Sequence, residues 1–217
     1  MGRSGLDALP WILCIVSLAL AGSAFAQDAA FTYPIRPGTE AWKSIHPVEQ
    51  SAAVQIPEQR LAEMSTEALL ETVLNYPLFS QMLIHNSTQA GFDSLVASFN
   101  GLQELMDRHD AAEALLKTYR RVDPSRVIGG WGLLEQGTYA FRIYYLEMLL
   151  AQDRVLQSMD YPQVRNLLAE SLTKRDQKLE RFDVYGAFGL ERTALVAAKG
   201  LGHADPTFVA KGLTTEM

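Results

Sequence analysis

Three residues in the second half of the chain have the types and spacing of a binding row. Glu135, Tyr139 and Arg142 follow one another by four and three positions, which places them on one side of a helix. A carboxylate, a phenol and a guanidinium in a row can bind a peptide or a carboxylate. The same spacing also fits a buried network between helices or a solvated face, and the sequence leaves these interpretations open.

Two further aromatic residues extend this row into a candidate interface. Trp131 lies in a glycine-rich break just before the helix, and Tyr145 lies about one turn beyond Arg142. Aromatic side chains and arginine contribute most of the binding energy at protein interfaces. We therefore predict that Trp131, Tyr139, Arg142 and Tyr145 contact a peptide or protein partner.

A catalytic interpretation is the alternative, and it depends on His85 and Glu135. An enzyme needs at least two titratable groups that converge in a pocket, and these two residues are the first to inspect. His85 follows the apolar residues Met82-Leu-Ile84. We expect it to be half-buried with its hydrogen bonds satisfied. In the catalytic interpretation the protein is a hydrolase that acts on cell-wall or peptide material outside the cell.

The sequence lacks the motifs of nucleophilic and metal catalysis. It has no Gly-x-Ser-x-Gly, and no two of its histidines have the i, i+4 spacing of a helical zinc site. Ser171-Leu-Thr-Lys174 matches Ser-x-x-Lys by letters, but it falls in mid-helix in a charged run without the companion motifs. We predict no catalytic residue, no metal site and no cofactor.

The N-terminal residues 1–26 have the pattern of a secretory signal. The apolar run from Leu9 to Ala21 is shorter than the roughly 20 residues that span a bilayer, and Ala24-Phe-Ala26 is a small-x-small cleavage site. Cleavage there would remove Cys14, the only cysteine, which excludes thiol nucleophiles and thiolate metal sites. We expect a periplasmic or extracellular protein with no stable membrane span after cleavage.

The charge balance bears on the class of partner. The chain carries 19 Lys and Arg against 25 Asp and Glu, a formal net charge of −6. Nucleic-acid binding depends on a basic stripe that neutralises phosphates, and no such stripe is present. The sequence therefore favours a protein or peptide partner over a nucleic acid.

Helices must position all of these residues. Ser65 and Asp110 precede apolar residues at three- and four-residue steps, which is typical of helix N-caps, and the strongest helix is expected from Leu133 to Met159. No stretch alternates apolar and polar residues as a strand does. We predict an all-α fold, an array or irregular bundle of helical hairpins that can include degenerate HEAT-like or armadillo-like repeats.

The predicted organisation has four parts. Residues 1–26 are the signal peptide, and 27–56 form an extended, proline-rich arm. Residues 57–202 form a single helical domain with a break near 124–132, and 203–217 form a tail. An arm that reaches onto a neighbouring subunit would favour a third role, a structural subunit of an envelope assembly.

Several short strings in the first half resemble a group of uncharacterised exported bacterial proteins. The resemblance covers about residues 33–122 and implies export, a helical body and a bacterial host, but no activity, cofactor or site residue. The strings are Tyr33-Pro-Ile-Arg-Pro-Gly-Thr-Glu-Ala-Trp42, Gln55-Ile-Pro-Glu58, Met64-Ser-Thr-Glu67, Val73-Leu-Asn-Tyr-Pro77, Gly91-Phe92 and Phe99-Asn-Gly-Leu-Gln-Glu-Leu105. Our leading hypothesis is an exported helical binding or scaffold protein without catalysis of its own.

Overall fold

The computed structural model describes residues 28–127 and 130–205. These residues form an all-helical structure without a β-strand, which confirms the predicted fold class. The predicted signal peptide lies outside the described residues, as does the tail from residue 206 onward. The α-helices are α2 (Glu40–Lys43), α3 (Gln50–Ala53), α4 (Glu58–Glu63), α5 (Thr66–Leu74), α6 (Thr88–Ser98), α7 (Asn100–Asp107), α8 (Ala111–Arg121), α9 (Leu133–Leu150), α10 (Asp153–Gln157), α11 (Tyr161–Glu180) and α12 (Phe182–Ala204), and the 3-10 turns are η1 (Pro47–Glu49), η2 (Phe79–Ile84) and η3 (Pro124–Arg126).

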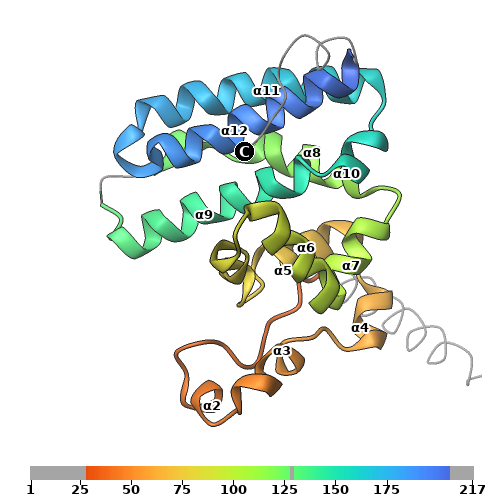
Figure 1. The fold of residues 1–217 in the computed structure, drawn as a ribbon, viewed down its shortest axis with the longest axis vertical. Coiled ribbons are helices and arrows are strands. Elements are labelled where there is room, and N and C mark those ends of the chain that lie inside the picture. Colours follow the sequence, from red (N-terminus) through yellow and green to blue (C-terminus); the bar gives the residue numbers. More distant parts are fainter. Residues whose placement is uncertain (1–27, 128–129, 206–217) are drawn as a thin grey trace, which may run out of the picture.

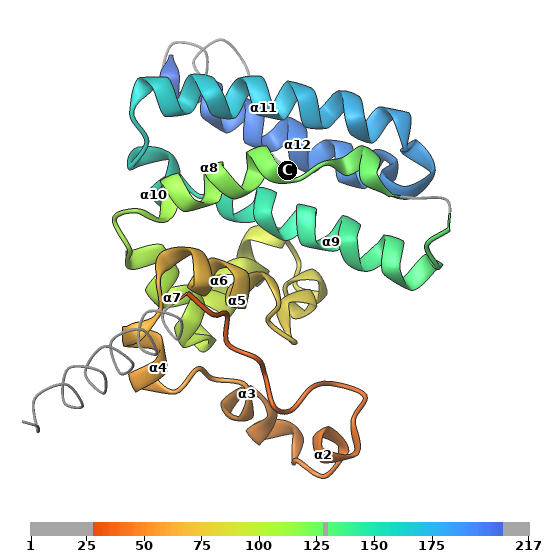
Figure 2. The same ribbon diagram turned by 180° about the vertical axis from the view of Figure 1, so that it is seen from behind.

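The helices are stacked in three tiers. Helices α11 and α12 form an antiparallel pair at the top of Figure 1, α8 and α9 lie beneath them, and α5 to α7 lie beneath α8 and α9. Figure 2 shows the same order from behind. Helix α9 packs on α12, and α5 contacts α7, α8 and α9. One apolar core runs through all three tiers and includes Leu69 of α5, Leu115 of α8 and Leu167 of α11.

The segment before α4 is bound to the lowest tier at both of its ends. Tyr33 is buried, and its hydroxyl donates a hydrogen bond to the Thr72 carbonyl at 3.2 Å. The Ile56 amide donates to Asn100 Oδ1 at 3.1 Å, and Asn100 Nδ2 donates to the Ile56 carbonyl at 2.7 Å. Between these anchors the backbone is irregular and carries only α2, η1 and α3. A role for this segment as an arm toward another subunit stays a prediction.

The two predicted N-cap residues act differently. Ser65 Oγ accepts from the Ala68 amide at 3.3 Å, as an N-cap does. Asp110 occupies the N-cap position of α8, but its side chain makes no cap hydrogen bond. Its Oδ1 instead accepts from Thr66 Oγ1 at 2.8 Å, so it links the start of α8 to the start of α5.

The predicted helix from Leu133 to Met159 is wrong in its length, because the chain breaks between α9 and α10. Gln152 has an extended backbone with ψ 134°, and its Nε2 donates to the Met148 carbonyl at 2.8 Å. This bond satisfies a carbonyl near the end of α9. Asp153 then begins α10, where a carboxylate is favoured by the helix dipole.

Candidate functional site

The first half of α9, residues 133–142, begins at a glycine break and faces solvent. Glu135 Oε2 accepts from the Gly132 amide at 2.9 Å, which satisfies one of the free amides at the helix start. Leu133 and Leu134 are 88% and 84% exposed, although both are large apolar residues. In Figures 1 and 2 this end of α9 extends past the lower tier at the edge of the molecule.

One hollow of about 520 Å³ lies beside this half-helix, and we call it the Trp131 hollow. The rings of Trp131 and Tyr139 meet edge to face, with centroids 5.5 Å apart. The Tyr139 hydroxyl donates to the Asp123 carbonyl at 2.9 Å, and burial raises the pKa of Tyr139. These contacts fix both rings in place. The hollow is lined by Trp131, Leu134, Glu135, Thr138, Tyr139 and Arg142.

Arg142 joins this half-helix to the tier below. Its Nη1 donates to Asn75 Oδ1 at 3.3 Å, and its Nη2 forms an ion pair with Glu71. Both partners belong to α5 or to its C-terminal cap. The Arg142 side chain remains about one quarter exposed, at 26%. Arg142 is thus held in position while it still reaches solvent.

A second hollow of about 470 Å³ lies between α9, the end of α5, η2 and the segment before α4, and we call it the Arg36 hollow. Its two charged lining residues, Arg36 and Arg142, are both cationic. Tyr145 lines it as well and stacks on Phe79, with ring centroids 4.1 Å apart. Its apolar walls are Leu74, Tyr76, Leu133, Leu134, Phe141 and Tyr145.

The structure brings the four predicted contact residues to these two adjoining hollows. Trp131, Tyr139 and Arg142 line the first, and Arg142 and Tyr145 line the second. Sequence reasoning missed Arg36 and the two leucines of the first turn. No periodicity within α9 marks the leucines, because Leu133 lies about three turns before Tyr144, which is buried on the same side of the helix.

The two residues of the catalytic alternative do not meet in either hollow. His85 directly follows η2 and is exposed, so the prediction of a half-buried histidine is wrong. The backbone at His85 is extended, and residues 83–87 before α6 are all exposed. Glu135 lines the Trp131 hollow, where its carboxylate is bonded to the start of α9.

The second half of α9, residues 143–150, holds a charged network inside the core. Glu147 is 0% and Lys178 1% exposed by side chain, and Lys178 Nζ lies 2.7 Å from Glu147 Oε2. Glu147 also accepts from Tyr119 Oη at 2.9 Å and from Thr193 Oγ1 at 2.8 Å. Lys178 Nζ donates further to the Gly189 carbonyl at 3.0 Å and to Thr193 Oγ1 at 2.9 Å. Burial lowers the pKa of Lys178, and the Glu147 carboxylate opposes that effect.

This network joins four helices, and the sequence analysis did not anticipate it. Tyr119 comes from α8, Glu147 from α9, Lys178 from α11 and Thr193 from α12. The charged run on α11 that holds Ser171 also contains Lys174 and Lys178, and all three are buried. The signal was their spacing, since they continue the stripe of Val164 and Leu167 at alternating steps of three and four.

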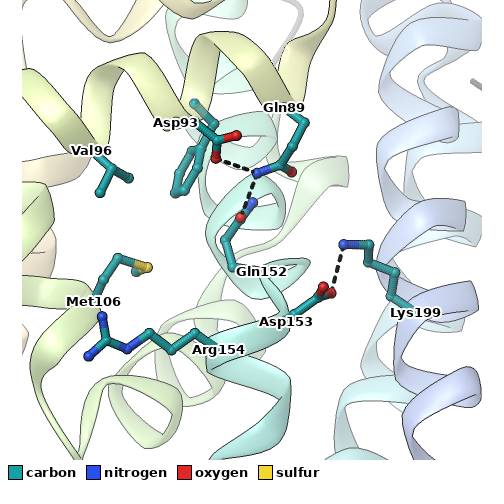
Figure 3. Close-up of a pocket in the computed structure, with 9 residues that line it drawn as sticks. Gln89, Asp93, Val96, Met106, Gln152, Asp153, Arg154 and Lys199 are labelled. Carbon is teal, nitrogen blue, oxygen red and sulfur yellow. Dashed lines mark hydrogen bonds and ion pairs between the residues drawn. The ribbon is translucent and has the colours of Figure 1, made fainter.

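A third hollow of about 440 Å³, the Gln152 hollow, lies where α6 and α7 meet α10 and α12 (Figure 3). Three of its four charged lining residues are in ion pairs, and the fourth, Asp93, accepts a hydrogen bond from a neutral amide. Asp153 lies 2.9 Å from Lys199, Arg154 lies 2.5 Å from Asp107, and Gln89 donates to Asp93 at 2.8 Å. Figure 3 shows Gln89 between Asp93 and Gln152, and Asp153 directed at Lys199. The charged residues that line this hollow are thus of both signs, whereas those of the Arg36 hollow are both positive.

Residues 28–127 and 130–205 contain no group of three or more His, Cys, Asp or Glu side chains that could hold a metal ion. None of the helices in these ranges is long and apolar enough to cross a membrane. No protein-family model, curated protein or solved structure matches the chain, so the resemblance over residues 33–122 stays a prediction.

Proposed function

We propose that this protein is an exported helical binding protein, without catalysis of its own, that recognises a protein or peptide partner through residues 133–142 of α9. One observation carries the proposal. Leu133 and Leu134 are almost fully exposed on a helix that is bordered by two hollows. Large apolar side chains that gather beside hollows and arginine mark interaction surfaces on soluble proteins.

The side chains around these leucines support the proposal because they are held in place without a partner. Trp131 and Tyr139 pack on each other, and Tyr139 and Arg142 are bonded to Asp123 and to Glu71. A surface whose side chains are fixed in advance loses less conformational entropy when it binds. The half-helix therefore suits recognition of a partner segment that brings the complementary apolar residues.

The test is site-specific photo-crosslinking in cells that export the protein. A photoreactive amino acid replaces Leu134 in one variant and Leu172 in a matched control. Leu172 lies on α11 and is 53% exposed, so both sites are exposed leucines on long helices. We expect a discrete crosslinked species from position 134 and not from position 172.

Two substitutions make the result specific to this surface. In a chain that carries the photoreactive residue at position 134, Arg142→Ala should weaken the crosslink, whereas Arg175→Ala on α11 should leave it unchanged. Arg175 is an exposed arginine whose ion pair is with its neighbour Asp176. Equal crosslinking from positions 134 and 172, or none from 134, would contradict the proposed function.

A further inference from the structure

We propose that the Arg36 hollow binds an acidic, apolar segment of the partner, so that a carboxylate meets Arg36 and Arg142 while apolar side chains cover Leu134 and Phe141. This inference rests on the proposed function and specifies the chemistry of the partner. The charges and the apolar walls of this one hollow together indicate that chemistry.

The charge of the hollow is opposite to that of the chain. The protein has a formal net charge of −6, yet the two charged residues that line this hollow are arginines. Arg36 is exposed, and its Nε donates to the Tyr33 carbonyl at 3.4 Å. Within the described part of the chain no carboxylate pairs with Arg36. Arg142 is shared with Glu71, so an incoming carboxylate would find one unpaired guanidinium and one shared guanidinium.

The walls of the hollow supply the apolar part of the recognition. Leu133 and Leu134 are exposed at its edge, and Phe141 is 43% exposed. Ser80 and Thr138 also line it, and Thr138 can only accept from a peptide amide, because its hydroxyl donates to the Leu134 carbonyl at 2.7 Å. A volume of about 470 Å³ accommodates a few side chains, which fits a segment inserted from a larger partner.

These features discriminate between segments of different charge. A lysine-rich segment with the same apolar residues would bring like charges together, which is unfavourable in a partly desolvated hollow. A neutral segment would offer Arg36 only uncharged acceptors such as amide oxygens, which form weaker hydrogen bonds with a guanidinium than a carboxylate does. An acidic segment therefore compensates best for the hydration that Arg36 loses.

The experiment uses the purified mature protein and three capped, fluorescent peptides. The peptides share Leu and Phe residues at the i, i+3, i+4 and i+7 positions of a helix and differ only in that their polar positions are Glu, Gln or Lys. We expect the Glu peptide to bind about tenfold more tightly than the Lys peptide at low salt. The ratio should fall toward one at high salt, because exposed charges are screened.

Variants at Gly137 test whether the peptide occupies this hollow. Gly137 lines it, and a Cβ at this position would meet nothing within 4 Å, so longer side chains fit without disturbing the fold. Gly137→Gln controls for size. Gly137→Glu should weaken the binding of the Glu peptide relative to that control, and Gly137→Lys should strengthen its binding. Arg36→Gln should remove most of the preference for Glu over Lys, while Arg175→Gln on α11 should retain it.

The outcomes separate this inference from the proposed function. If the three peptides bind α9 with equal affinity, or if the Gly137 series responds to size but not to charge, the acidic segment is ruled out and α9 remains a binding surface. If no peptide binds and position 134 also gives no crosslink in cells, both proposals fail. A Glu preference that survives Arg36→Gln would likewise overturn the assignment to this hollow.

Discussion

The two halves of α9 lie in different surroundings, although they belong to one helix. Residues 143–150 are buried almost without exception and include Glu147, which is fully enclosed. Residues 133–142 contain no buried residue, and their first two are leucines exposed to solvent. One continuous helix thus carries a core polar network at one end and an uncovered apolar surface at the other.

The second half of α9 is held rigidly by its buried contacts, whereas the first half is left exposed as a surface. Three donors compensate Glu147, and its partner Lys178 is fully hydrogen-bonded, so the second half is locked against α8, α11 and α12. The first half needs no further neighbours to stay helical, because it continues a helix that is already held. A recognition surface built this way is presented on a rigid support.

Loss of one charge from the buried pair should have the largest effect. Glu147→Ala leaves Lys178 charged and unpaired in the core, and we expect a loss of about 3–5 kcal/mol in the free energy of unfolding. The double substitution Glu147→Leu with Lys178→Met should lose less than the sum of the two single changes, since neither charge remains. Urea unfolding measures the free energy of unfolding of each variant. If the single variants lie within about 0.5 kcal/mol of the parent protein, the ion pair does not stabilise the second half of α9.

Removal of one hydroxyl from the network should cost less. Tyr119→Phe takes away the donor 2.9 Å from Glu147 Oε1 but keeps the ring, and we expect a loss of about 1–2 kcal/mol. Tyr161→Phe is the matched control, because Tyr161 is 65% exposed and should tolerate the change. An equal response of both variants in urea unfolding would argue against a special role for Glu147.

Alkaline pH should weaken the fold through its buried tyrosines. Burial raises the pKa of Tyr145 from 10.0 to about 12 and the pKa of Tyr119 well above its ordinary value. The unfolded chain therefore releases these protons first. The stability that the phenols contribute is complete below pH 10 and is lost as the pH rises toward 12. Urea titrations at several pH values should show this fall, and it should be smaller in Tyr145→Phe. A flat profile would contradict it.

Substitution of Gly137 in the first half of α9 should stabilise the protein slightly, in contrast to the losses above. Gly137 lies inside α9 with open space around its Cβ position, so Gly137→Ala should raise the free energy of unfolding by about 0.5–1 kcal/mol. Gly91→Ala should destabilise the protein, because a Cβ there would overlap the backbone of Met82. Thermal unfolding of the two variants gives the sign of each. A loss of stability in Gly137→Ala would mean that this surface is covered in the folded protein.

The helical fold and the general position of the candidate surface were predictable from local patterns. Apolar steps of three and four residues identify helices without reference to their neighbours, and the spacing of Tyr139 and Arg142 placed both on one side of α9. The break at Gln152 was not predictable in this way. It depends on a side chain that bonds back to Met148 at the junction with the next helix.

The buried network and the Arg36 hollow could not be predicted from local sequence patterns for another reason. Lys178 looks like part of a solvated charged run until Glu147 is known to lie opposite it, and the two residues are far apart in the sequence. Arg36 lies in the irregular segment before α4, and only the tertiary fold places it beside Arg142. Both features depend on contacts between residues that are distant in the sequence, and the periodicity of a single helix does not reveal such contacts.

Hydrogen exchange along α9, with and without the Glu peptide, tests the division of this helix most directly. We predict that amides of residues 143–150 are strongly protected in the free protein and do not change. Amides of residues 133–142 should exchange faster in the free protein and become protected when the peptide binds. Protection that appears at the Gln152 hollow instead, with residues 133–142 unchanged, would contradict the assignment of the binding surface to the first half of α9.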